Sequence, residues 1–164
     1  MSGFKLLLSV LLVFLSLRGS LIAQNIKFEH ITDKDGLPQN VITSIYQDSY
    51  GFMWFGTQNG LARYDGYEFK IFQNKKGDST SISNNLIEGI VQDASGTLWI
   101  GTLEGGVNSY DYISDSFKSY KQGDSGLTSN DILCLEVDEK GTLWLGTLKG
   151  GLCIYDQEKD SFKE

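Results

Sequence analysis

One pattern recurs three times along this chain and constrains its fold more than any other feature. The segments 48–57, 93–102 and 138–147 all read Asp-x-x-Gly-x-x-Trp-x-Gly-Thr. Their tryptophans, which are Trp54, Trp99 and Trp144, lie 45 residues apart. Self-similarity at a fixed period of roughly 20 to 50 residues indicates a fold built from repeated structural units.

The repeat extends to both sides of this segment. Apolar stretches begin after Asn40, Asn85 and Asn130, and a Tyr-Asp pair follows at 64–65, 110–111 and 155–156. A unit of about 45 residues is the size of one four-stranded blade of a β-propeller. We therefore predict an all-β fold of three four-stranded antiparallel blades, spanning residues 40–73, 85–121 and 130–164.

Each repeat divides into four strand-sized pieces, which in the first copy cover residues 41–47, 52–57, 61–65 and 68–73. Asp-x-x-Gly predicts a turn between the first two, because Asp accepts a hydrogen bond from the backbone two residues on and Gly adopts positive φ. The 19 glycines, one proline and 12% aromatic residues also favour short strands joined by tight turns. The residues that define the repeat are Asp48, Gly51, Trp54, Gly56, Asp93, Gly96, Trp99, Gly101, Asp138, Gly141, Trp144 and Gly146.

The tryptophans allow two interpretations, a stacking platform for sugars or a large side chain packed between neighbouring sheets. One Trp per blade, flanked by apolar residues, favours packing. The first strand of each blade is predicted to line the central channel, where Ser44, Gly89 and Cys134 are small enough to fit. Cys134 and Cys153 are both predicted to be small packed residues rather than a disulfide, although an oxidising compartment would permit pairing.

The sequence at the two ends of the chain does not predict a closed propeller ring. Residues 26–32 resemble the fourth-strand pieces and are predicted to form an orphan latch strand ahead of the blades. The third repeat stops within its fourth strand, and propellers close with about four to eight blades. Residues 24–164 are therefore predicted to form an incomplete propeller, truncated in its third blade and belonging to something larger.

Residues 1–23 have the three-part form of a secretory signal peptide. Lys5 precedes an apolar run from Leu6 to Leu17, and small residues lead to a predicted cleavage site between Ala23 and Gln24. A permanent N-terminal anchor is the alternative, but the run of 12 residues is shorter than the roughly 20 that span a bilayer. The sequence thus predicts export, and a periplasmic location.

The charge of the chain argues against nucleic acid as a partner. The leader contains two of the 14 basic residues, Lys5 and Arg18, and none of the 21 acidic ones, so its removal changes the formal charge from −7 to −9. Nucleic-acid binding requires a basic surface. One carboxylate per turn is too few for calcium, which takes six to eight oxygen ligands, so we expect no metal and no cofactor.

The chain resembles a known family, the two-component regulator propellers at the front of hybrid sensor histidine kinases of Bacteroidota. The resemblance rests on residues 31–32, 35–40, 51–61, 64–69 and 81–85. It implies a sensory segment outside the inner membrane that responds to glycan fragments and controls transcription of polysaccharide-utilisation genes. An oligosaccharide ligand is implied, and the loops 74–85 and 121–130 are expected to shape the ligand face, with no individual contact residue identified.

The sequence contains no phosphoacceptor-type helix, nucleotide-binding glycine pattern or second apolar span. The expected partners are therefore the remaining blades and the kinase of a longer protein, or other chains, with any membrane contact made by that downstream region. One alternative is a free-standing secreted binding or scaffold protein that assembles blades from several chains. Another is a propeller lyase or hydrolase, but His30 is the single histidine and lies on the predicted latch, so we expect no catalysis.

Overall fold

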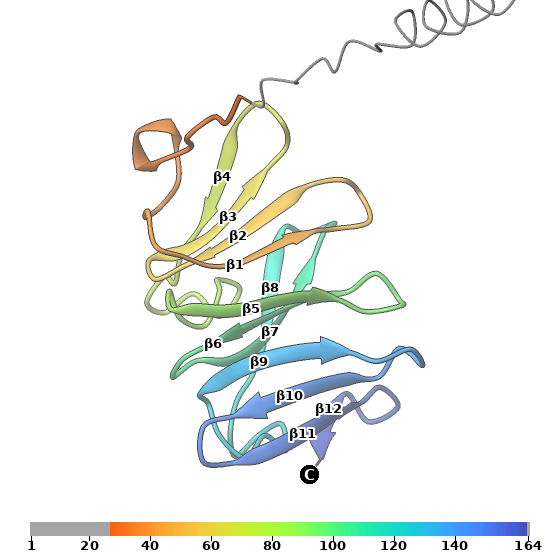
Figure 1. Ribbon diagram of the computed structural model, residues 1–164. Helices are drawn as coiled ribbons and strands as arrows, with labels where there is room; N and C mark the ends of the chain where they lie inside the picture. Colours follow the sequence, from red (N-terminus) through yellow and green to blue (C-terminus); the bar gives the residue numbers. More distant parts are fainter. Residues whose placement is uncertain (1–26, 164) are drawn as a thin grey trace, which may run out of the picture. The chain divides into compact units, whose positions relative to one another are not determined.

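The computed structural model describes residues 27–163, which contain three four-stranded antiparallel sheets (Figure 1). The first blade consists of β1 (Ile42–Gln47), β2 (Met53–Thr57), β3 (Gly60–Tyr64) and β4 (Phe69–Phe72). The second consists of β5 (Ile87–Gln92), β6 (Leu98–Thr102), β7 (Gly106–Asp111) and β8 (Ser116–Tyr120). The third consists of β9 (Ile132–Val137), β10 (Leu143–Thr147), β11 (Gly151–Asp156) and β12 (Ser161–Lys163).

Strands pair in sequence order within every sheet, so each blade is a simple meander. This confirms the predicted all-β class and the three antiparallel blades. The first strands β1, β5 and β9 lie side by side where the blades converge, and the fourth strands lie at the outer edges (Figure 1). Each 45-residue repeat of the sequence forms one blade, because it contains four strands and the turns between them.

The predicted latch strand is not formed in this structure. Residues 27–32 have no strand geometry, and Asp33–Asp35 form a single 3-10 turn capped by Thr32. A latch strand needs a sheet that lacks its own outer strand. Every sheet among the described residues already has four strands, so segment 27–32 has no partner of this kind there.

The loop before each blade is held by two repeated contacts. A buried aliphatic side chain, Leu37, Ile82 or Leu127, anchors each loop. Three residues later an asparagine side chain accepts a hydrogen bond from an upstream backbone N–H: Asp33 donates to Asn40, Asn74 to Asn85 and Gln122 to Asn130. Residues 31–40 are therefore folded as the lead-in loop of the first blade.

Each blade has a trailing face toward the blade that follows and a leading face toward the blade before it. Residues directly opposite each other in a ladder share a face, which places Tyr46, Trp54 and Arg63 together on the trailing face of the first blade. The tryptophan packs on the leading face of the next blade. Ring centroids are 5.0 Å apart between Trp54 and Tyr110, and 4.6 Å apart between Trp99 and Tyr155.

Glycine permits this close approach of the blades. A Cβ atom built on Gly56 would lie 2.8 Å from Cγ2 of Ile87, and one on Gly101 would lie 2.8 Å from Cγ2 of Ile132. These separations are shorter than any real Cβ contact. The first-strand isoleucine of one blade therefore fills a recess that only glycine leaves open in the blade before it.

An ion pair closes the outer rim of both joints. Lys70 binds Asp115 of the second blade, and Lys118 binds Asp160 of the third. Tyr120 and Tyr155 also donate hydrogen bonds to Asp160, at 2.7 and 2.8 Å. Hydrogen bonds from Lys118 and Tyr120 lower the pKa of the Asp160 carboxyl to about 2, while burial and the bond to Asp160 raise the pKa of Tyr120 to about 12.

The two cysteines are free and have different environments. Cys134 lies opposite Gly146 and Cys153 lies opposite Leu145, so their side chains point to opposite faces of the third blade. Cys153 is buried by the second blade, as expected for a small packed residue. Cys134 is exposed, and the expectation that it is packed was wrong because no blade covers the trailing face of the third blade in this structure.

We expect truncation of Trp99 to destabilise the chain far more than truncation of Trp144. Trp99 is buried between two blades, and removing such a side chain costs about 3–5 kcal/mol. Trp144 lies on the uncovered trailing face and is half-buried. Urea unfolding of Trp99→Ala and Trp144→Ala in dilute solution should show this difference, and equal losses would contradict the joint described above.

We expect the rim ion pair to make stability depend on pH between about 4 and 2. The pKa of Asp160 is below that of an unfolded aspartate, so its stabilising effect is complete above about pH 4 and disappears as the pH falls through about 2. Asp160→Asn should be less stable than the parent chain near neutrality, and the two should converge near pH 2. Asn tolerates the left-handed backbone of residue 160. Urea unfolding across pH 2–6 checks this, and a difference that did not vary with pH would overturn it.

Candidate functional site

The repeat-defining residues form a hydrogen-bonded turn between the first two strands of each blade. In the first blade, Oδ1 of Asp48 accepts bonds from the backbone N–H groups of Tyr50 and Phe52, both at 3.0 Å. Its Oδ2 accepts a bond from Nε1 of Trp54 at 2.7 Å. Asp93 and Asp138 make the same tryptophan bond, to Trp99 at 2.7 Å and to Trp144 at 3.0 Å.

Three of the repeat-defining glycines close these turns, with positive φ at Gly51, Gly96 and Gly141. The bond from Trp144 and those from backbone N–H groups lower the pKa of Asp138. The carboxylates are thus engaged in fixing the tryptophans and the turns. The repeat residues position the blades, and a ligand site must be sought elsewhere.

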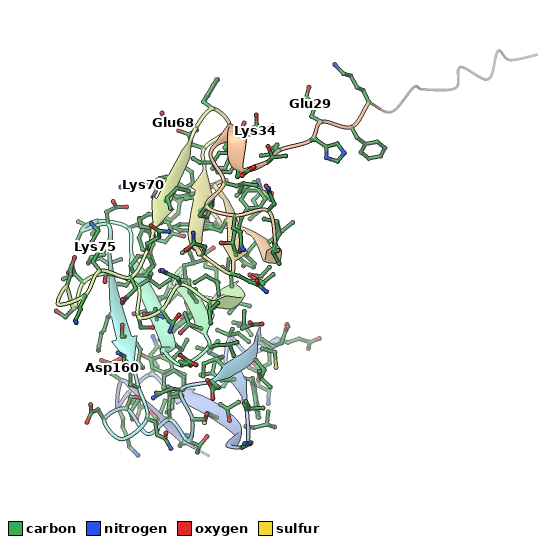
Figure 2. The ribbon with its side chains drawn as sticks, turned by 90° about the vertical axis from the view of Figure 1, so that its left-hand side faces the viewer. Glu29, Lys34, Glu68, Lys70, Lys75 and Asp160 are labelled. Atoms are coloured by element: carbon green, nitrogen blue, oxygen red, sulfur yellow. The ribbon has the colours of Figure 1, made fainter. Side chains whose placement is uncertain are left out.

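The loops that the sequence suggested for ligand binding border two equivalent grooves at the outer rim. One, of about 340 Å³, lies between β4 and β8 and is lined by the loop residues Asp78 and Thr80 together with Lys70 and Asp115. The other, of about 600 Å³, lies between β8 and β12 beside Asp124 and Asp160. Figure 2 shows Lys70, Lys75 and Asp160 on this side of the molecule.

Ion pairs between neighbouring blades line both rim grooves. Lys70 and Asp115 are paired with each other, as are Lys118 and Asp160. Burial alone would raise the pKa of Asp115, but the bonds from Lys70 and Tyr110 lower it. A ligand would therefore compete with the ion pairs that close the joints.

A third groove, of about 520 Å³, is lined by tyrosines from two different blades, among them Tyr50 and Tyr112. Tyr50 lies in the β1–β2 turn and Tyr112 in the β7–β8 turn, and their ring centroids are 4.7 Å apart. The Tyr112 hydroxyl donates to Oδ2 of Asp48 at 2.8 Å, which ties its ring to the first blade. Burial and this bond raise the pKa of Tyr112, so the phenol is neutral at physiological pH.

The Tyr50 ring remains 67% exposed at this groove, although its neighbour is fixed. Polar side chains of the second blade line the rest of the groove, among them Ser95, Ser109 and Asp111. Ser109 and Lys118 lie opposite each other in the β7–β8 ladder, so they share a face. The groove combines a fixed aromatic surface with hydroxyl and carboxylate groups, and with the Lys118 ammonium, which is already paired with Asp160.

Sequence analysis missed both tyrosines because neither occupies a repeated position. The residues equivalent to Tyr50 are Ser95 and Lys140, and Gln157 is equivalent to Tyr112. The sequence did contain a signal for this site, because each of these turns has an aromatic residue where the other copies carry none. Aromatic side chains that break a structural repeat have no packing role required by that repeat.

The remaining predicted features carry no site in the described part of the chain. His30 lies in the exposed segment 27–32, and no cluster of three His, Cys, Asp or Glu side chains that could hold a metal occurs within residues 27–163. Over the same residues there is no helix of the length and hydropathy needed to span a membrane. The signal peptide and the Ala23–Gln24 cleavage site lie outside the described residues.

Comparison with known proteins identifies the repeat. A family model described as two component regulator propeller matches residues 36–59, 81–104 and 126–149. Each match begins in a lead-in loop and ends just after the second strand of the blade. The Histidine kinase P4 of Formosa agariphila is 42% identical over 74 residues, which are 45% of this chain and 5% of that protein.

Solved structures from B. thetaiotaomicron share the fold. The extracellular domain assigned to hybrid two component system BT3049 superposes with a TM-score of 0.76 at 28% identity, over 83% of this chain and 20% of that one. The corresponding domain of BT4673 gives a TM-score of 0.66 at 32% identity, over 82% of this chain and 19% of that one. The chain thus spans about a fifth of these domains. Each of its three blades thus contains one segment that matches the two-component regulator propeller family.

Proposed function

We propose that this chain is an extracytoplasmic sensory segment of a two-component regulator and that it binds an oligosaccharide in the groove formed by Tyr50 and Tyr112. The family of the repeats supports the sensory role, and the predicted signal peptide and the extracellular relatives support the location. Kinase activity and transcription control belong to other parts of such a system. The groove would bind the glycan to which the system responds.

The observation that carries the ligand proposal is the exposed Tyr50 ring beside a fixed Tyr112 ring. Sugars present apolar C–H faces that pack on aromatic rings and hydroxyl groups that need both donors and acceptors. Tyrosine suits such surfaces because its ring is apolar and its hydroxyl is polar. The volume of about 520 Å³ lies within the usual range for ligand pockets, about 300–1,000 Å³.

We expect Tyr50→Ala to weaken oligosaccharide binding by about fivefold, because an aromatic contact contributes on the order of 1 kcal/mol. The probes are cello-, laminari-, xylo- and manno-oligosaccharides, titrated by calorimetry into the purified chain. Tyr67→Ala is the matched control, since Tyr67 is 94% exposed and does not line this groove. Equal effects of the two substitutions, or no binding of any probe, would reject this groove as the site.

We also propose that the chain is exported and cleaved after Ala23. Mass spectrometry of the protein recovered from the periplasm should show an N-terminus at Gln24. Replacing Ala23 by a bulky residue, Ala23→Tyr, should leave the leader attached, because signal peptidase requires a small residue there. Recovery of the intact leader on the unchanged chain would favour a permanent anchor instead.

A further inference from the structure

The groove formed by Tyr50 and Tyr112, called the tyrosine groove below, has a counterpart at the joint between the second and third blades. This counterpart, called the polar groove, has a volume of about 270 Å³, and its lining includes Ser95, Lys140 and Gln157. In the repeat, Ser95 and Lys140 are equivalent to Tyr50, and Gln157 is equivalent to Tyr112. The two grooves therefore occupy the same position at successive joints and differ in their side chains.

Small and polar side chains at the second joint leave open the space that aromatic rings fill at the first. The Tyr50 and Tyr112 rings are 4.7 Å apart, and the Tyr112 hydroxyl is bonded to the first blade. The hydroxyl of Ser95 instead donates to Asp93 of its own turn at 2.6 Å, and Gln157 is exposed. The tyrosine groove thus offers a ring surface, whereas the polar groove offers an open recess.

The two grooves adjoin at the β5–β6 turn, because Ser95 lines both of them. The β1–β2, β5–β6 and β9–β10 turns lie on the same side of the blade array (Figure 1). A Cβ atom built on Gly141 would lie 3.1 Å from Cβ of Ala94, so the two turns that border the polar groove are in contact. A chain-like ligand in the tyrosine groove can therefore continue past Ser95 into the polar groove.

Lys140 and Gln157 give the polar groove exposed hydrogen-bonding groups. The basic residues that form ion pairs within residues 27–163 are Arg63, Lys70, Lys118, Lys159 and Lys163. Lys140 is outside that set, so its ammonium can donate to a ligand. The amide of Gln157 can both donate and accept, as a sugar hydroxyl requires.

Carboxylates at both grooves favour a neutral ligand over an acidic one. Asp111 lines the tyrosine groove, and Asp93 lines the polar groove. Hydrogen bonds from the Ser114 hydroxyl and the backbone N–H of Ile113 lower the pKa of Asp111, so this carboxyl is ionised near neutrality. The chain as a whole has a formal charge of −7. A uronate in either groove would be repelled by these negative charges.

We propose that the ligand is a neutral oligosaccharide long enough to occupy both grooves, with one part packed on Tyr50 and the next part bonded to Lys140 and Gln157. This inference rests on the sugar-binding role proposed for the tyrosine groove and extends that site across the second joint. A ligand confined to the tyrosine groove contacts the first and second blades. A ligand that fills both grooves also contacts the third.

The length of the ligand provides the test. Disaccharides and hexasaccharides of the cello-, laminari-, xylo- and manno-series are titrated by calorimetry into the purified chain. In the series that binds, we expect the hexasaccharide to bind more tightly than the disaccharide. Lys140→Ala and Gln157→Ala should each weaken hexasaccharide binding by about fivefold, the usual effect of one lost hydrogen bond, and should not change disaccharide binding.

Glu158→Ala is the matched control, because Glu158 is exposed, follows Gln157 in the same turn and lines neither groove. It should change the binding of neither length, whereas Tyr50→Ala should weaken both. Affinity that does not depend on ligand length, or on Lys140 and Gln157, would overturn the extension and leave the tyrosine groove as the site.

Two further outcomes separate the remaining parts of the proposal. A hexasaccharide of galacturonic acid that bound as tightly as the neutral hexasaccharides would overturn the neutral class of ligand. If neither length of any series bound, the tyrosine groove itself would be rejected, and the extension with it.

Discussion

The joint between successive blades is the interaction on which the rest of this structure depends. A four-stranded sheet of about 45 residues buries little apolar surface alone, and such units become stable by stacking. Here the tryptophan of one blade packs under the aromatic residues of the next, and a first-strand isoleucine enters a glycine recess. Among residues 27–163, the second blade is covered on both faces, while the first and third are each covered on one.

Packing at the joint also engages several polar groups that could otherwise bind a ligand. The turn aspartates hold the tryptophan indoles, and Asp115 and Asp160 hold lysines across the rim. The candidate ligand surface lies where the repeat is broken. Tyr50 and Tyr112 belong to that surface, and the bond from Tyr112 to Asp48 connects it to the joint.

Sequence reasoning predicted the strand ends of the first blade to within about one residue, because the spacing of Trp54, Trp99 and Trp144 repeats the structural unit directly. It could not predict that Cys134 is exposed and Cys153 buried. That difference depends on which face of the third blade has a neighbour, and the repeat alone treats all blades as equivalent. The candidate groove was missed for a related reason, since it arises between two turns that carry different residues in each copy. The segment 27–32 resembles a fourth strand, but a strand requires a partner edge as well as a suitable sequence.

The lead-in loops have an effect beyond fixing the start of each blade. The backbone N–H of Phe117 donates to the carbonyl of Thr80, and that of Phe162 donates to the carbonyl of Ser125. Each loop thereby occupies part of the outer edge of the blade that follows it, where another strand could otherwise add. In the second and third blades, the outer edge is thus covered by the loop of the same repeat, while stability still comes from stacking on a neighbouring blade. Gene duplication or deletion of a 45-residue module could therefore change the number of blades without creating a new edge for aggregation.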